Sequence, residues 1–230
     1  MQAITNEQLI KRNARLAKYI YPVGLLVLAS GLLVSFRRPD LLIIPYSTLI
    51  IGFLLSNFAV SLTNRYVSRP DRPRPDSALS DALKGLDDRY RLYSFILPAT
   101  YTLVCPAGVY VIIPKFQGGS LTWDKSRNRF RHRGGSIFRN LFGQEWLGSP
   151  LIEAESEARK LTRFLEKEFG GAAPPVKSVI VFTNPKIDIQ GLNGVPIPTI
   201  KAKRLNAFLR KQPKGETLSP EQIERIDQVI

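Results

Sequence analysis

The sequence has few of the sulfur and imidazole side chains that form disulfides and bind transition metals, with one cysteine, one histidine and one methionine among its 230 residues. A single cysteine excludes a disulfide within the chain and fits a reducing compartment. One cysteine and one histidine also exclude a zinc site built from several such ligands. We interpret Cys105, which precedes Pro106, as a core thiol at a strand end. His132 lies between two arginines and is interpreted as a solvated basic residue.

Charge is missing from two neighbouring stretches, Tyr19–Phe36 and Leu41–Asn64, which are separated only by Arg37–Asp40. Each is long enough for a helix that crosses a bilayer, which takes about 17–25 apolar residues. A cleaved signal peptide has a shorter apolar region of about 7–15 residues and a small-residue cleavage site. The sequence therefore predicts a membrane hairpin rather than a signal peptide followed by a buried core helix.

Small residues recur at four-residue spacing in both stretches, as Gly31/Ser35 and Gly52/Ser56. Such spacing lets helices approach closely in lipid. It predicts faces open to a neighbouring helix, so that other membrane-protein subunits are candidate partners in addition to the lipid bilayer.

The distribution of lysine and arginine predicts the orientation of the hairpin, because cytoplasmic flanks carry the excess. The connecting loop has only Arg37 and Arg38. We expect a two-pass protein of the cell membrane with both termini and the soluble domain in the cytoplasm. The basic residues of the two outer flanks are Lys11, Arg12, Arg15 and Lys18, and Arg65, Arg69, Arg72 and Arg74.

Composition divides the chain into four parts: a basic N-terminal segment at 1–18, the hairpin at 19–64, a Pro/Arg-rich linker at 65–78 and a cytoplasmic domain at 79–230. Prolines interleaved with charges predict an extended, stiff linker over Val67–Ser77. The remaining 150 or so residues have the size of one domain.

The domain is predicted to be α/β, with a mixed sheet and flanking helices, from the order of strands, long helix, strand and short helices. Ser149-Pro150 opens the long helix and Gly170-Gly171 ends it. A short helix or turn is expected at 81–88, a short helix at 202–209 and a last helix from Ser219. Strands are expected at 91–96, 100–105, 109–113, 120–123, 129–131 and 177–183, with short edge strands at 187–189 and 197–200.

The stretch TYTLVCPAGVYVIIPKFQGGSLTWD resembles the core of the nuclease-related domain (NERD) family, which has a restriction-endonuclease-like, PD-(D/E)xK fold. Two later pieces follow in the same order: Gly148-Ser149-Pro150 opening a helix, and then VIVFTNPKIDI. The resemblance covers Leu86 to Ile189. It implies a restriction-endonuclease-like domain after two transmembrane helices and, in active members, hydrolysis of nucleic acid assisted by a divalent metal.

The metal-binding carboxylates of that family are replaced in this sequence. With the turn glycine placed on Gly108, the family's Asp position falls on Thr100 and its Glu position on Ile113, while its lysine is retained as Lys115. A further family glutamine falls near Glu153, which in the first turn of a helix is more typical of a dipole interaction. Thr and Ile do not replace the anionic oxygens that Mg²⁺ prefers. We therefore expect a vestigial site, no metal and no cofactor.

A basic segment follows the expected strand at 120–123, in a chain of net charge +14. Alternation on a strand places every second arginine on one face. Such a face could follow the phosphates of nucleic acid, with Phe130 and Phe138 available to stack on bases, or contact anionic lipid. The alternative is a solvated edge strand whose charge blocks edge-to-edge pairing. The basic residues are Lys125, Arg127, Arg129, Arg131, Arg133 and Arg139.

Three functional hypotheses remain. The first is a membrane-anchored, non-catalytic binding or scaffold protein, such as an accessory subunit of a membrane complex. The second is a membrane-tethered nucleic-acid-binding protein. The third is a metal-dependent nuclease with a relocated site, which requires two carboxylates close to each other and to Lys115; its candidates are Asp87, Asp88, Asp124 and Glu153.

Overall fold

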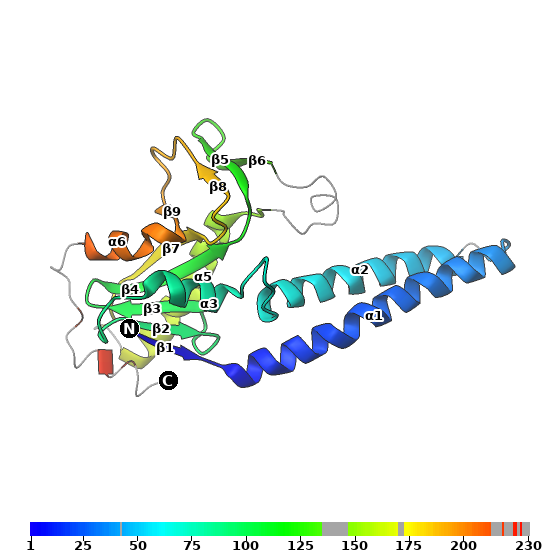
Figure 1. Ribbon diagram of the computed structural model, residues 1–230, viewed down its shortest axis with the longest axis horizontal. Coiled ribbons are helices and arrows are strands. Elements are labelled where there is room, and N and C mark those ends of the chain that lie inside the picture. The colour runs from blue at the N-terminus through cyan, green and yellow to red at the C-terminus, as the bar shows by residue number, and fades with distance from the viewer. Residues whose placement is uncertain are drawn as a thin grey trace. The chain divides into compact units, whose positions relative to one another are not determined.

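The computed structural model describes residues 1–41, 43–134, 147–169, 173–212, 218, 223–224 and 226. These residues form two compact units, drawn in Figure 1. One unit is a helical hairpin within Glu7–Arg74, and the other combines Met1–Asn6 with the described residues from Pro75 onward. Several residues named in the predictions above lie outside the described part: Phe138, Arg139, Gly170, Gly171 and Ser219.

The hairpin consists of α1 (Glu7–Arg37) and α2 (Ile43–Tyr66), so the two apolar helices expected from the sequence are confirmed. Both are long and apolar enough to cross a membrane, and only 11% of the apolar window of each is buried. A core helix of a soluble protein would be mostly buried. All but one of the large apolar side chains that are exposed in the described part of the chain belong to the 16–58 region. An apolar surface of that extent marks an interaction with lipid or protein.

Buried positions recur every seven residues along the two helices, the spacing of a left-handed helix pair. The seam is built mainly of small residues, which let the helix backbones approach each other. Its members are Ile10, Ala17, Gly24 and Gly31 in α1, and Gly52, Ala59 and Tyr66 in α2.

The glycines of this seam pack against the other helix of the hairpin. A Cβ on Gly31 would lie 1.8 Å from the Thr48 Oγ1, and one on Gly24 would lie 2.9 Å from the Ser56 Oγ. Ser35 is exposed. The expectation that the four-residue pairs leave small-residue faces open to another subunit is therefore wrong for Gly31 and Gly52, because α1 and α2 bury both against each other.

The expected linker is partly structured. Arg69 and Arg72 exchange backbone hydrogen bonds of 3.0 and 3.1 Å, which close a tight turn. Helix α3 (Pro75–Leu83) begins inside the 65–78 segment and ahead of the helix or turn expected at 81–88. Proline is well suited to a first helical position, where its missing N–H costs nothing. The extended spacer predicted from the prolines is thus wrong from Pro75 onward.

The second unit contains a mixed six-stranded sheet in the order β1-β2-β3-β4-β7-β9, as the α/β expectation required. β2 to β4 are antiparallel neighbours, whereas β1–β2, β4–β7 and β7–β9 are parallel pairs. The strands are β1 (Gln2–Thr5), β2 (Arg91–Ser94), β3 (Tyr101–Cys105), β4 (Gly108–Lys115), β7 (Val176–Phe182) and β9 (Thr199–Lys201).

A smaller sheet has the order β6-β5-β8, with β5 (Gly119–Asp124), β6 (Arg129–Arg133) and β8 (Ile187–Ile189). Helix α5 (Pro150–Phe169) is the long helix predicted after Ser149. A 3₁₀ turn, η2 (Ala202–Arg204), leads into α6 (Leu205–Arg210), where one helix was expected. Strand β2 is shorter than predicted, because Phe95 adopts a positive φ of 61° directly after it.

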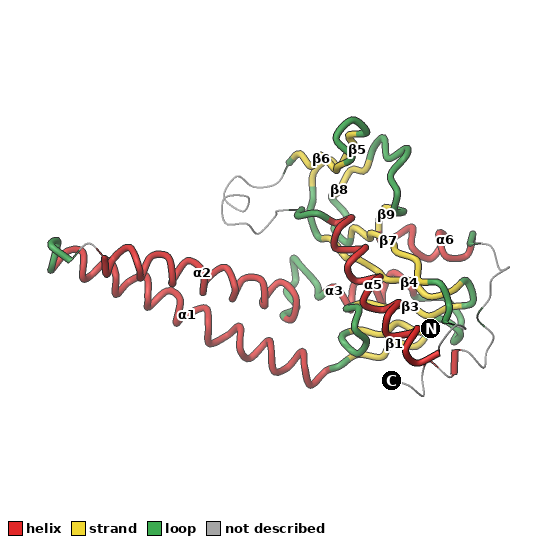
Figure 2. Tube along the Cα trace, turned by 180° about the vertical axis from the view of Figure 1, so that it is seen from behind, coloured by secondary structure: helices red, strands yellow, loops and turns green. Residues whose placement is uncertain are grey.

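The large sheet has a core on each face, which Figures 1 and 2 show as helices on either side of the strands. Alternate residues of β4 serve the two cores. On one face, Val111 and Ile113 belong to the same core as Ala154 and Leu161 of α5. On the other face, β4 packs in a core with α3 and α6: Tyr110, Ile112, Leu79, Leu83, Leu205 and Leu209.

Strand β1 was not predicted, since 1–18 was interpreted as one basic segment. Gln2–Thr5 pairs in parallel with Arg91–Ser94. The backbone N–H of Gln2 donates to the Tyr90 carbonyl over 2.9 Å. The hairpin is therefore inserted in the sequence between an edge strand and the rest of the sheet domain.

Candidate functional site

The four positions of the expected vestigial site come from three elements of the sheet domain. Thr100 directly precedes β3, Ile113 and Lys115 lie in the second half of β4, and Glu153 lies in the first turn of α5. The Lys115 ammonium forms an ion pair with Glu153 Oε2. The Lys115 side chain is only 13% exposed, against 48% for Glu153. The structure thus brings Lys115 and the helix carboxylate of Glu153 together as a partly buried pair.

Thr100 contacts a different carboxylate, which the sequence analysis missed. Glu157 Oε2 accepts hydrogen bonds from the Thr100 backbone N–H (2.8 Å) and hydroxyl (3.1 Å). Its other oxygen, Oε1, accepts from Lys160 Nζ over 2.7 Å. Burial alone raises the pKa of Glu157, but the hydrogen bonds from Lys160 and Thr100 outweigh it and lower the pKa below the ordinary 4.5. The available signal was its position four residues after Glu153, on the same side of a helix.

Ile113 provides no polar group to this region. It is 3% exposed and belongs to the core between the sheet and α5. The two carboxylates of the region therefore both come from α5. Glu153 pairs with Lys115, and Glu157 pairs with Lys160 and accepts hydrogen bonds from Thr100. Such an arrangement joins the sheet to the helix and leaves the charges compensated.

The carboxylates of the relocated-site hypothesis pair with separate cations. Asp87 pairs with Arg89 (2.6 Å), Asp88 with the Met1 ammonium (3.1 Å) and Asp124 with Arg131. The side-chain hydrogen bond from Arg89 lowers the pKa of Asp87. Within the described residues, no group of three or more His, Cys, Asp or Glu side chains could hold a metal ion.

The basic segment forms the edge strand β6, where Arg129, Arg131 and Arg133 are exposed and the intervening residues are half-buried. The predicted one-sided alternation is confirmed for these three arginines. Lys125 and Arg127 lie in the turn before the strand and not on it. Arg139 lies outside the described residues.

Acidic and aromatic neighbours change the character of this arginine face. Arg129 lies opposite Asp124 in the strand register, and Asp124 also pairs with Arg131 over 2.8 Å. Phe130 points away from the arginines and packs edge-on against Trp123, with ring centroids 5.1 Å apart. It is not available on that face to stack on a base.

His132 is not the solvated residue that the sequence suggested. Its side chain is half-buried, and Nε2 lies 2.6 Å from the Gly118 carbonyl oxygen, to which it donates. The alternation that exposes the arginines turns this ring inward, against the loop that precedes β5.

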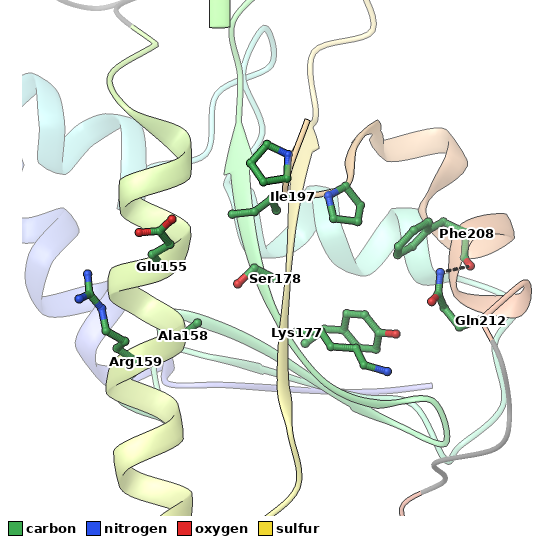
Figure 3. A pocket seen from close by; sticks show the side chains of 11 residues that line it. Glu155, Ala158, Arg159, Lys177, Ser178, Ile197, Phe208 and Gln212 are labelled. Carbon is green, nitrogen blue, oxygen red and sulfur yellow. Dashed lines mark hydrogen bonds between the residues drawn. The ribbon is translucent and has the colours of Figure 1, made fainter. Parts of the chain in front are cut away.

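A cavity of about 640 Å³ lies beside β7, and no residue pattern had pointed to it. β7 pairs with β9 only from Ile180 to Phe182, so that, in the described chain, Val176–Val179 have no strand on that side. Figure 3 shows Ser178 on the α5 side of β7 and Lys177 on the other. The Lys177 Nζ lies 5.9 Å from the centre of the Tyr110 ring.

The walls of this cavity are mixed in character. Glu155 and Arg159 of α5 lie along one side and Phe208 of α6 along the other, as Figure 3 shows. An apolar segment, Pro196-Ile197-Pro198, completes the lining. Burial raises the pKa of Tyr110 to about 12, so its hydroxyl stays protonated. The cavity therefore offers an open strand edge between charged and apolar side chains.

Comparison with known proteins gives no match: no family model, no curated protein and no solved structure resembles the chain significantly.

Proposed function

We propose that this chain is a membrane-anchored, non-catalytic binding protein, in which a restriction-endonuclease-like domain related to the NERD family holds a partner instead of cleaving nucleic acid. One observation carries the proposal: Lys115 forms an ion pair with Glu153 of α5, and Thr100 donates hydrogen bonds to Glu157 of the same helix.

The physical argument concerns the ligands that a metal would need. A hard divalent cation takes several oxygen ligands, with carboxylates among them. At the family's positions this domain has a hydroxyl that already donates to Glu157, and a core isoleucine, Ile113. Recruiting Glu153 and Glu157 as ligands would break the ion pair with Lys115 and the hydrogen bonds with Thr100. The arrangement favours a structural role for these residues.

The binding role is supported by the cavity beside β7. An unpaired strand edge can accept an extended peptide, because main-chain hydrogen bonds supply affinity and neighbouring pockets supply specificity. Lys177 and Ser178 project to opposite sides of that edge, so that alternate side chains of a bound segment would meet different walls. A subunit of a membrane complex is the partner that best suits a domain attached to a hairpin.

The exposed apolar surface of α1 and α2, together with the lysine and arginine residues that flank them, supports a membrane location. We propose a two-pass arrangement with both termini and the sheet domain in the cytoplasm. The tight internal packing of the seam makes the hairpin a stable anchor in its own right.

A nuclease assay on the full-length protein in lipid nanodiscs tests the non-catalytic proposal. The substrates are linear DNA and RNA, single- and double-stranded, with Mg²⁺ or Mn²⁺ present. We expect no cleavage above the level seen with Lys115→Ala. Cleavage by the native chain that disappears in Lys115→Ala would overturn the proposal.

A photo-crosslinking residue at Ile197 tests the binding role in intact membranes. We expect a discrete crosslinked product that disappears when Lys177→Glu is added, and no such product with the crosslinker at exposed Arg163 on α5. Absence of a product at Ile197, or one that Lys177→Glu leaves unchanged, contradicts binding at this cavity.

Nucleic-acid binding is the second candidate, favoured by the exposure of Arg129 and Arg133 on β6. Its signature would be binding of labelled DNA or RNA that weakens steeply with salt. Loss of binding in R129Q/R133Q, but not in the matched exposed pair K203Q/R204Q, would establish it. Equal behaviour of the two variants assigns any binding to overall charge. The third hypothesis, a relocated nuclease, is disfavoured because its candidate carboxylates pair with separate cations.

A further inference from the structure

A second cavity lies wholly within the hairpin unit, between α1 and α2 at the end away from their connecting loop. Its volume is about 820 Å³. Toward the loop, Gly24, Gly31 and Gly52 keep the two helices close. The seam holds larger residues toward the other end, Ile10 and Tyr66, and Figure 1 shows the helices farther apart there. The lining residues are Ala14, Arg15, Ala17, Lys18, Tyr21, Val60, Thr63, Asn64, Val67 and Arg69.

All charged side chains that line this cavity are positive. Arg15, Lys18 and Arg69 line it, and no carboxylate does. Glu7 is the only acidic residue of α1, α2 has none, and the Glu7 Oε1 accepts from Arg74 over 3.5 Å. Three cations around one cavity without an anionic partner create a site for an anion.

The three cations differ in how they are held. Arg15 and Lys18 are exposed and make no hydrogen bond or ion pair with the residues that the structure describes. The Arg69 guanidinium donates to Asn64 Oδ1 over 2.7 Å, and its backbone is fixed by the turn with Arg72. One donor is thus positioned in advance, while two flexible donors can close on a ligand.

The position along the helices identifies the kind of anion. Lys18 directly precedes the uncharged Tyr19–Phe36 stretch, and Asn64 ends the second uncharged stretch. These boundaries correspond to the depth of lipid headgroups, where basic and aromatic residues such as Tyr21 gather. Ala14, Val60 and Val67 give the cavity apolar walls beside its cations. A soluble phosphate would leave those walls without an occupant.

We propose that this cavity binds the headgroup of an anionic phospholipid, whose phosphate accepts hydrogen bonds from Arg15, Lys18 and Arg69. The acyl chains follow the exposed apolar surface of α1 and α2. This inference rests on the proposed membrane location. It adds a specific lipid site to what would otherwise be a general attraction of basic flanks for an anionic surface.

The test uses the full-length protein reconstituted in vesicles of phosphatidylcholine with a minority of phosphatidylglycerol. After extraction in a mild neutral detergent, native mass spectrometry measures the phosphatidylglycerol retained on each protein. The site variant is R15Q/K18Q. The matched control is K11Q/R12Q, which removes two exposed charges from the same flank of α1 outside the cavity. We expect retention to fall about tenfold or more in the site variant and to stay unchanged in the control.

Equal loss in both variants would overturn the inference, because it would show that flank charge alone attracts the lipid. Arg69→Gln, which lies outside both helices, is expected to reduce retention as well; full retention contradicts the site. Competition by inorganic phosphate at equal concentration overturns the assignment to a lipid. Resistance of the protein to carbonate extraction from the same vesicles tests membrane integration separately, so that failure of the anchor is distinguished from failure of this site.

Discussion

Glu157 binds Thr100 twice, through the backbone N–H at 2.8 Å and the hydroxyl at 3.1 Å, although the two residues lie 57 positions apart. This contact joins α5 to the chain just before β3. Under the proposed resemblance, Thr100 takes the position of a metal-binding aspartate. The Glu157 carboxylate is therefore held by hydrogen bonds to protein groups at both ends of the contact, Thr100 on one side and Lys160 on the other.

Replacing Glu157 by alanine is expected to lower the free energy of unfolding by about 1–3 kcal/mol, since hydrogen bonds to a largely buried charged group are lost. The side chain is 14% exposed, so solvent screens these contacts only in part. Glu166→Ala, at an exposed position of the same helix, is the control and should change stability by less than about 0.5 kcal/mol. Denaturant unfolding measures both. Equal values for the two variants would contradict a structural role for Glu157.

Acid should remove the contribution of Glu157 to the free energy of unfolding. Its pKa in the folded protein lies below the ordinary 4.5, so the unfolded chain takes up the proton at higher pH. The stabilisation is therefore complete above about pH 4.5 and is lost as the pH falls through the lower folded-state pKa. The difference in stability between the native protein and Glu157→Gln should shrink over that window. A difference independent of pH between 3 and 7, roughly the range over which carboxylates titrate, would contradict the assignment.

Cys105 provides a probe of unfolding, because it is the only cysteine and is fully buried. Its Sγ lies 3.4 Å from the Gly108 carbonyl oxygen, and burial raises its pKa to about 11. The thiolate is the reactive form. At pH 8, alkylation by iodoacetamide should be at least about 100-fold slower in the native protein than in denaturant. Rapid labelling of the native protein would show that this strand end is open.

The parts of the fold that the sequence predicted are those in which one physical requirement dominates. An uncharged stretch of spanning length has few alternatives, so α1 and α2 were identified, though α1 starts at Glu7. Strands β3, β4 and β7 are rich in β-branched residues and bounded by turns. Strand β1 was missed because Gln2–Thr5 is short and directly precedes a long helix, so only its partner strand makes it a strand.

The candidate site was less predictable, because its contacts join distant parts of the chain. The alignment on Gly108 identified Lys115 and Glu153, which do meet, but not Glu157. The seam of the hairpin could have been found, since Gly24 and Gly31 lie seven residues apart. The four-residue pairs are equally visible in the sequence, and only the pairing of the two helices decides which spacing forms the contact.

Replacing Gly31 by alanine is expected to loosen the hairpin, because the added Cβ would lie 1.8 Å from the Thr48 Oγ1 and 2.8 Å from the Thr48 Cβ. Overpacking of this kind costs about 1–3 kcal/mol. Thermal unfolding in nanodiscs measures the effect. Ser35→Ala, at an exposed position one turn later, is the control and should leave the transition unchanged. A Gly31→Ala protein as stable as the control would show that this glycine does not set the approach of the helices.

The edge strand β1 can be tested with proline, because proline removes one backbone donor. The N–H groups of Gln2 and Asn6 donate to the carbonyls of Tyr90 and Ser94. Since direction alternates along a strand, the N–H of Ile4 points toward β2 and that of Ala3 points away from it. Proline is tolerated on an edge strand only where its N–H would face outward.

Ile4→Pro should therefore lower the free energy of unfolding by about 2 kcal/mol or more, through the lost ladder bond and the lost packing of Ile4 against the core. Ala3→Pro is the matched control, and we expect it to change stability by less than about 1 kcal/mol. The denaturant concentration at which Cys105 becomes reactive to iodoacetamide measures the stability of both variants in the full-length protein. A larger loss of stability in Ile4→Pro than in Ala3→Pro would show that the residues before the hairpin are part of the sheet domain. Equal midpoints would show that β1 contributes nothing to the domain, and that the sheet begins at β2.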